Sequence, residues 1–171
     1  HSDAYPAGHM CHAELMLRID GPTWYRFSIN KGTIHVARDG RESFVPGTVF
    51  CKPVLDLNQY TFVRVAMTRE RQYNIYRFVR AQLGARFHRL GYYTNFVAGT
   101  QFGVRRFHGG LYEKRRAWFC SELICAAMQA GGLLTSFRPC LATPNMLYRE
   151  SARLPEANAG MHPKRVGPGM V

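Results

Sequence analysis

Cys120 is the residue whose type and position best fit covalent chemistry. It stands at the start of the run CSELICAAMQ, which is apolar almost all round and is followed by Gly131-Gly132. This pattern predicts a helix buried against a sheet. Unpaired backbone N–H groups at the start of such a helix stabilise a thiolate, and they also suit the oxyanion of a tetrahedral intermediate. Cys125 lies inside the same helix without that advantage. The spacing therefore predicts a nucleophile at Cys120, although a free cysteine is more often a small buried apolar residue.

A nucleophilic thiol needs a base, and histidine is the usual one. The chain has seven histidines: His1, His9, His12, His35, His88, His108 and His162. His12 is preferred as the general base because it begins a predicted strand, which is a rigid element. His35 lies in the middle of another predicted strand. His88 and His108 lie in polar stretches, where a surface histidine is the ordinary interpretation.

These groups must be positioned by elements that the local pattern predicts. β-branched and aromatic runs separated by Asp-Gly-Pro and Asn-Lys-Gly turns predict strands, and capping residues predict helices. Strands are expected over 12–19, 24–29, 33–37, 48–55 and 60–66. Helices are expected over 68–83, 88–98 and 119–130, and a further helix is expected to begin at 143. Loops are expected over 38–46 and 99–117. Strands come first and helices later, which favours an α+β fold.

Composition sets the class of the protein. The chain has 171 residues, 46% of them hydrophobic, which suffices for one domain with a core. We place that domain at 10–153. The pair His9-Met10 resembles a cloning junction, so 1–9 is expected to be a tag remnant or a flexible N-terminus. The segment 154–171, rich in Pro, Gly and basic residues, is expected to be a flexible tail. No apolar run is long enough to cross a membrane.

The net charge and the cysteine content indicate which partners and which compartment suit the protein. The formal net charge is +12, which attracts polyanions and acidic surfaces. The basic residues of loop 105–116 could steer an anionic partner. Five widely spaced cysteines without a CxxC pair do not suggest disulfides or a zinc site, and they favour a reducing compartment, such as cytoplasm, or a virion. No GxxxxGK phosphate loop is present, so no cofactor and no metal is expected.

A resemblance sharpens these expectations. The early His-Ala-Glu-Leu strand (12–15) and the late Trp-Phe-Cys-Ser-Glu-Leu-Ile helix start (118–124) resemble the circularly permuted papain-like thiol hydrolases, the permuted branch of the NlpC superfamily. The segments 24–29, 83–91 and 142–147 are similar to further family segments in the same order, so the resemblance spans about 11–150. Bacterial, phage and large-virus proteins of this kind are the most similar. In the middle segment the usual Tyr-Asp is Phe87-His88.

The resemblance implies a permuted papain-like fold, in which an antiparallel sheet packs against a helix carrying the cysteine. It implies Cys120 as nucleophile and His12 as general base. A third group should hold the imidazole. Glu14 is the first choice, because two residues along a strand return to the same face. Ser28 on the neighbouring strand and His35 one strand further are competitors, and Glu122 in the first helical turn is the structural alternative.

The expected reaction is attack of a thiolate on a carbonyl carbon through an acyl-enzyme. Amide, peptide and acyl-ester or acyl-lipid substrates all suit this chemistry. Two other classes stay open: a catalytically idle structural or virion-associated binding protein on the same fold, and a basic nucleic-acid-binding protein, whose affinity would fall steeply with salt.

Overall fold

Three antiparallel strands form the sheet that positions the N-terminal part of the site. The computed structural model describes residues 12–19, 21–57, 60, 62–88 and 117–157. The strands are β1 (Leu15–Leu17), β2 (Tyr25–Ile29) and β5 (Val49–Pro53), in the order β1-β2-β5. Phe27 in the middle strand lies opposite Leu15 on one side and Cys51 on the other. β1 and β2 thus form a hairpin, with bends at 21 and 22 between them. The strand expected over 12–19 was too long, because the pairing with β2 covers only Leu15–Leu17, so His12 and Glu14 precede β1.

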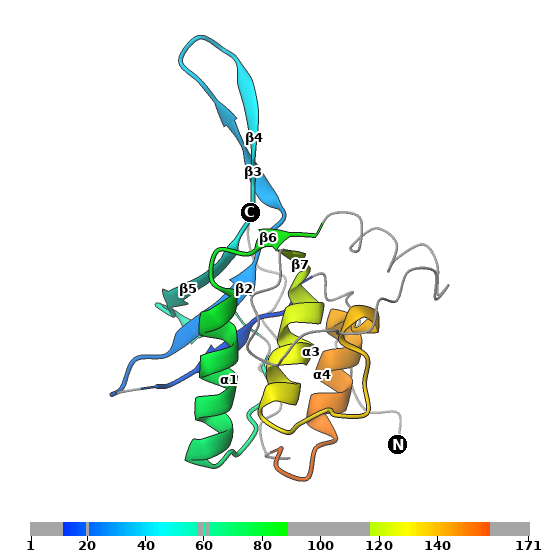
Figure 1. The fold of residues 1–171 in the computed structure, drawn as a ribbon. Helices are drawn as coiled ribbons and strands as arrows, with labels where there is room; N and C mark the ends of the chain where they lie inside the picture. The colour runs from blue at the N-terminus through cyan, green and yellow to red at the C-terminus, as the bar shows by residue number, and fades with distance from the viewer. Residues whose placement is uncertain (1–11, 20, 58–59, 61, 89–116, 158–171) are drawn as a thin grey trace, which may run out of the picture.

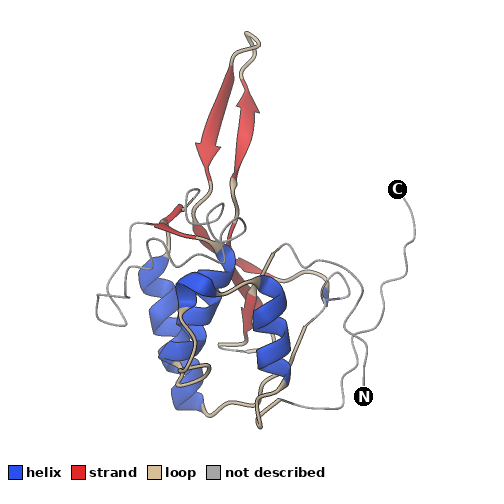
Figure 2. Ribbon diagram, turned by 90° about the vertical axis from the view of Figure 1, so that its right-hand side faces the viewer, coloured by secondary structure: helices blue, strands red, loops and turns tan. Residues whose placement is uncertain are grey.

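A second antiparallel pair projects from the body as a long hairpin (Figures 1 and 2). It consists of β3 (Gly32–Val36) and β4 (Glu42–Pro46). The expectation of a loop over 38–46 was wrong for its second half. Both strands are exposed to solvent, so no alternation of buried and exposed residues marks β4 in the sequence. Backbone pairing with β3, rather than burial, makes this segment a strand.

Helix α1 (Arg69–Gln82) follows the sheet and is capped at both ends. The Thr68 side chain accepts a hydrogen bond from the backbone N–H of Arg71, and the chain leaves the helix through Gly84, whose φ is +79°. The helix agrees with the prediction over 68–83. The expected strand over 60–66 was wrong in its described part, where Val65 makes only an isolated bridge with Ala157.

Two further helices complete the C-terminal part. Helix α3 (Cys120–Ala130) is buried along almost its whole length, as its apolar sequence predicts. A 3-10 turn, η2 (Pro139–Leu141), leads to α4 (Pro144–Ala152). Thr143 caps α4 by accepting from the backbone N–H of Met146.

A short parallel pair joins the two halves of the chain. Strand β6 (Arg86–Phe87) pairs with β7 (Ala117–Trp118), which runs directly into α3. This pairing fixes the point at which the helix begins. Apart from His88 and Ala117, the segments expected as a helix over 88–98 and a loop over 99–117, the basic stretch 105–116 included, lie outside the described residues.

The core lies between one face of the sheet and the helices α1 and α3. Phe27 and Ile29 of β2, Phe78 of α1 and Leu123 of α3 are all fully or almost fully buried there. Trp118 packs edge-on against Phe78. The described part of the chain is therefore of mixed α+β class, with small antiparallel sheets and three α-helices, as expected.

The end of the described chain returns to the body. Backbone atoms of Glu156 and Ala66 are hydrogen-bonded, and the Glu156 carboxylate pairs with Arg71 at 2.8 Å. The first residues of the segment expected as a tail, 154–157, thus contact the domain, and 158–171 lie outside the described residues. None of the helices described in the structure is both long and apolar enough to span a membrane.

Candidate active site

The thiol of Cys120 sits at the first residue of α3. Its side chain is buried, with a residue exposure of 3%. The N-cap residue Phe119 offers no side-chain acceptor, so first-turn N–H groups stay available to other partners. The backbone N–H groups of Ala13 and Ser121 lie near the sulfur and lower the pKa of the thiol. Two amides from distant parts of the chain thus converge on the sulfur.

The imidazole of His12, three residues before β1, interacts with the Cys120 thiol, and each group shifts the pKa of the other. Burial raises the pKa of the Cys120 thiol, but the interaction with His12, the amides of Ala13 and Ser121 and the imidazolium charge outweigh burial, so the pKa lies below its usual value. In turn, the interactions with Cys120 and with Glu14 raise the pKa of His12 to about 9. Both shifts favour a thiolate–imidazolium pair.

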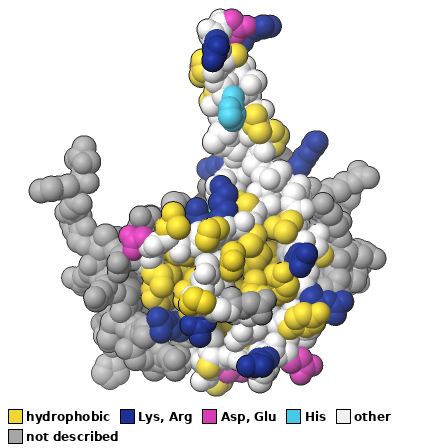
Figure 3. All heavy atoms as spheres, turned by 90° about the vertical axis from the view of Figure 1, so that its left-hand side faces the viewer, with side chains coloured by type: hydrophobic (Ala, Val, Ile, Leu, Met, Phe, Trp, Pro, Cys, Tyr) yellow, Lys and Arg dark blue, Asp and Glu magenta, His cyan; other side chains and the backbone are white. Residues whose placement is uncertain are grey.

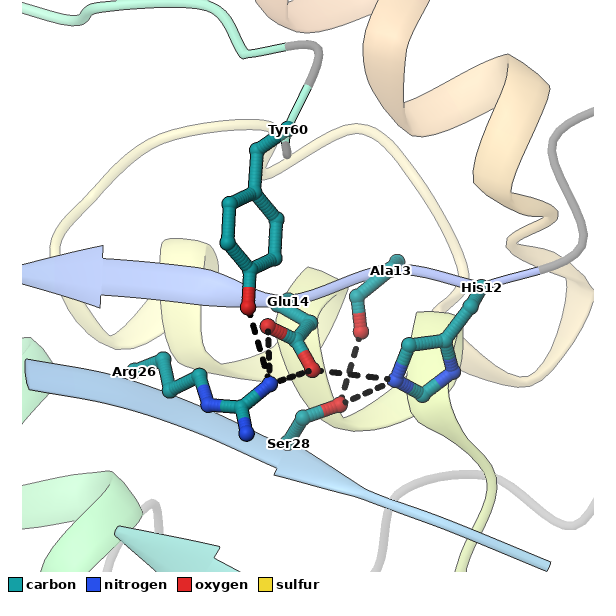
Figure 4. A network of polar contacts seen from close by, with 6 residues as sticks. All are labelled: His12, Ala13, Glu14, Arg26, Ser28 and Tyr60. Atoms are coloured by element: carbon teal, nitrogen blue, oxygen red, sulfur yellow. Dashed lines mark hydrogen bonds and ion pairs between the residues drawn. The ribbon is translucent and has the colours of Figure 1, made fainter. Parts of the chain in front are cut away.

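Ser28 of β2 sets the orientation of the imidazole ring (Figure 4). Its Oγ lies 2.9 Å from His12 Nε2 and donates to the Ala13 carbonyl oxygen, also at 2.9 Å. A hydroxyl has one hydrogen, and the carbonyl can only accept it, so Ser28 accepts a hydrogen bond from Nε2–H. This arrangement leaves Nδ1 as the nitrogen that faces the sulfur.

Glu14, just before β1, contacts the same ring nitrogen. Its Oε1 lies 3.4 Å from His12 Nε2, and its side chain is only 10% exposed. Arg26 Nη1 lies 3.3 Å from the same oxygen and donates to the hydroxyl of Tyr60 at 2.9 Å. Burial raises the pKa of Glu14, but His12 and the guanidinium charge of Arg26 together lower it below its usual value. The carboxylate therefore stays ionised between two cations.

The four candidates for the third group, which would hold the imidazole of His12, lie in different places in the structure. Glu14 and Ser28 both reach His12, each in a different way. His35 lies on the exposed face of the projecting strand β3, away from this cluster. Glu122 is buried within the first turn of α3. Burial, the neighbouring Cys140 and the charge of Glu122 together raise the pKa of the Cys125 thiol to about 12.

Three participants were missed from the sequence. The Ala13 backbone lies near the sulfur and accepts a hydrogen bond from Ser28, and only its place next to His12 hinted at this. Arg26 occupies an exposed-looking position of a predicted strand, and Tyr60 follows the sheet in a turn-rich segment. No local pattern marks either as a neighbour of Glu14, because the strand pairing and the loop bring them together.

Among the residues that the structure describes, no three His, Cys, Asp or Glu side chains are grouped so that they could hold a metal ion. The chemistry available is that of a thiol, an imidazole, a carboxylate and backbone amides.

Comparisons of this chain with protein-family models, with curated proteins and with solved structures gave no match. The site therefore has to be interpreted from its own geometry.

Proposed function

We propose that this protein is a cysteine hydrolase that cleaves an amide or acyl-ester bond through a thioester acyl-enzyme. The observation that carries the proposal is the interaction of the His12 imidazole with the Cys120 thiol, which joins two residues 108 positions apart in the sequence, raises the pKa of His12 and lowers that of Cys120. A buried thiol at a helix start, joined to a histidine held by a carboxylate, is the arrangement that nucleophilic catalysis by cysteine requires.

The reaction begins with the Cys120 thiolate and the protonated His12. The sulfur attacks the carbonyl carbon of the substrate and forms a tetrahedral intermediate, whose oxyanion the nearby amides and the start of α3 stabilise. His12 donates its Nδ1 proton to the leaving nitrogen or oxygen, and the bond to the leaving group breaks. A thioester with Cys120 remains.

Water completes the cycle. The neutral Nδ1 of His12 takes a proton from a water molecule, whose oxygen attacks the thioester carbon. The C–S bond then breaks, the carboxylic acid leaves, and Cys120 and His12 return to the ion pair. Glu14 supports both steps because its negative charge stabilises the imidazolium.

The order of the elements supports a more specific assignment. A histidine strand that precedes the cysteine helix, with an antiparallel sheet against that helix, is the arrangement expected of permuted papain-like thiol hydrolases. We propose membership of that group as part of the same hypothesis.

Acyl-enzyme trapping tests the proposal. The protein is incubated with p-nitrophenyl hexanoate, and nitrophenol release and intact mass after acid quench are measured. We expect a mass increase of one acyl group on Cys120 and release of many equivalents of nitrophenol per protein. Cys120→Ser should abolish both, and His12→Gln should slow both by roughly 100-fold or more.

Cys51→Ser is the matched control, because Cys51 is an exposed thiol on β5 outside the site. This variant should keep full turnover. The proposal is overturned if Cys120 in the folded protein is not acylated, or if His12→Gln leaves its acylation unchanged. Either result would favour an idle site on this fold.

A further inference from the structure

The sheet face that carries the site continues away from it as a strip of basic and aromatic side chains. Alternation along the strands puts Glu14, Ser28 and Phe50 in one cross-strand row, because Ser28 lies opposite Phe50 and Leu15 lies opposite Phe27. In the next row Arg26 lies directly opposite Lys52.

The strip extends one row further. The backbone of Val54 bonds to Trp24, which places these two residues side by side beyond the second row. The guanidinium of Arg18 lies over the Trp24 ring at 5.8 Å.

Each cation of this strip lies over an aromatic ring, and among the described residues Arg26 alone also pairs with a carboxylate, that of Glu14. Arg26 and Lys52 lie over the Phe50 ring from 5.5 and 5.3 Å. Among the described residues, Lys52 and Arg18 form no ion pair with a carboxylate, and Glu14 is the one acidic side chain on this face of the three strands. The face therefore carries an excess of positive charge next to the site.

Exposure increases along the strip from Glu14 outward. The side chain of Glu14 is 10% exposed and that of Arg26 31%, whereas Lys52 and Arg18 are exposed residues. Cys120 itself is buried, with a residue exposure of 3%, whereas the His12 side chain beside it is 35% exposed, so both the imidazole and the cations of the strip are accessible from solvent. Figure 3 shows apolar side chains gathered on the side of the molecule below the hairpin, with Lys and Arg side chains among and around them.

We propose that this strip, formed by Arg18, Arg26, Lys52 and the rings of Phe50 and Trp24, binds an oxyanion of the substrate, carboxylate or phosphate, attached by an apolar chain to the carbonyl that Cys120 attacks. Successive rows of a strand face are about 7 Å apart, and Arg26 and Lys52 stand two rows from His12. Their cationic groups lie over the Phe50 ring in the row next to His12, so an anion bound there is about one row from the site. The rings contact the apolar chain, and the cations bind the anion. The inference rests on the proposed function and adds its substrate class.

Matched esters test this inference. p-Nitrophenyl hexanoate, the monoester of adipic acid and the ester of 6-aminohexanoic acid share one chain length and differ in the charge at its end. A fourth ester with a terminal phosphonate distinguishes carboxylate from phosphate recognition. We expect kcat/KM to be highest for the anionic esters, lower for the neutral ester and lowest for the cationic ester. The difference should shrink at high salt, because exposed charges are screened.

Variants locate the effect. Lys52→Gln and Arg18→Gln should each lower the adipate-to-hexanoate ratio of kcat/KM by roughly two- to fivefold, the range of an exposed charge pair, and leave hexanoate turnover unchanged. Arg38→Gln removes one exposed charge at the hairpin tip and should leave the ratio unchanged. Arg26 is not used, because it also contacts Glu14.

The outcomes separate the two proposals. If the protein turns over the hexanoate ester but neither Lys52→Gln nor Arg18→Gln changes the adipate-to-hexanoate ratio of kcat/KM, the anion-binding strip is overturned and the hydrolase proposal stands. A ratio that Arg38→Gln lowers equally also overturns it, because the effect would then come from net charge. Absence of turnover with all four esters overturns both proposals.

Discussion

The Ser28 hydroxyl lies 2.9 Å from Nε2 of His12 and donates its hydrogen to the Ala13 carbonyl. Ser28 is completely buried, so water does not compete for these bonds. The pairing of β1 with β2 therefore decides which ring nitrogen faces Cys120. The orientation of the imidazole is a property of the sheet rather than of His12 alone.

Ser28 and Glu14 are expected to differ in what they do for His12. Ser28→Ala removes a neutral acceptor and should reduce kcat/KM by roughly five- to tenfold, the equivalent of about 1 kcal/mol. Glu14→Gln removes a charged partner, which is worth about 1.5–3 kcal/mol, and should cost more than tenfold. The pH profile of p-nitrophenyl hexanoate turnover distinguishes them. The alkaline pKa of this profile should fall in Glu14→Gln and stay unchanged in Ser28→Ala. A fall in both variants would show that the charge of Glu14 is not what raises the pKa of His12.

The pKa shifts predict a distinctive pH dependence. The pKa of His12 is raised to about 9 and that of Cys120 is lowered, so the ion pair persists between the two values. Iodoacetamide should therefore alkylate Cys120 rapidly already at neutral pH. Turnover should fall as the pH passes about 9, because His12 then loses the proton that it gives to the leaving group. His12→Gln is the comparison, because without the imidazolium the thiol should be alkylated rapidly only near the ordinary thiol pKa of about 8.5. An identical alkylation profile in both proteins would contradict the ion pair.

The hydrogen bond between Trp118 and Gln82 links α1 to the strand that leads into α3. The indole Nε1 donates to Gln82 Oε1 at 3.0 Å, and both side chains are fully buried. Gln82→Met keeps the approximate shape and removes the acceptor, so it should lower the free energy of unfolding by about 1–3 kcal/mol. Urea unfolding measures this loss. Ser43→Ala on the exposed hairpin is the control and should change the stability by less than about 0.5 kcal/mol, and an equal effect of both would refute the assignment.

The base of the hairpin has no space for a side chain at Gly47. A Cβ there would come within 1.7 Å of the carbonyl oxygen of Asn30, a backbone atom that cannot move alone. Gly47→Ala should therefore destabilise the protein by about 3 kcal/mol. Gly40 at the tip has a φ of +79° and open space around it, so Gly40→Ala should cost only about 1 kcal/mol from backbone strain. Thermal unfolding of the two variants provides the comparison, and equal losses would show that steric conflict at the base is not the cause.

Periodicity and capping residues predicted much of the local structure. Thr68 and Thr143 marked the starts of α1 and α4, and the all-round apolar sequence marked α3 as a buried helix. These signals work because capping and burial depend on residues close together in the chain. The hairpin strand β4 was missed for the opposite reason, since its pairing with β3 is unaccompanied by burial.

For the site, the sequence by itself determined that a thiol would stand at a helix start and that His12 and Glu14, two residues apart, would lie close to each other, although both precede β1 rather than belonging to it. Only the tertiary structure decided that Ala13, Ser28, Arg26 and Tyr60 would surround them. The physical reason is that alternation along one strand and the start of one helix are encoded locally. The contacts between β1, β2, the loop after β5 and α3 depend on strand register and on how the chain closes over long separations.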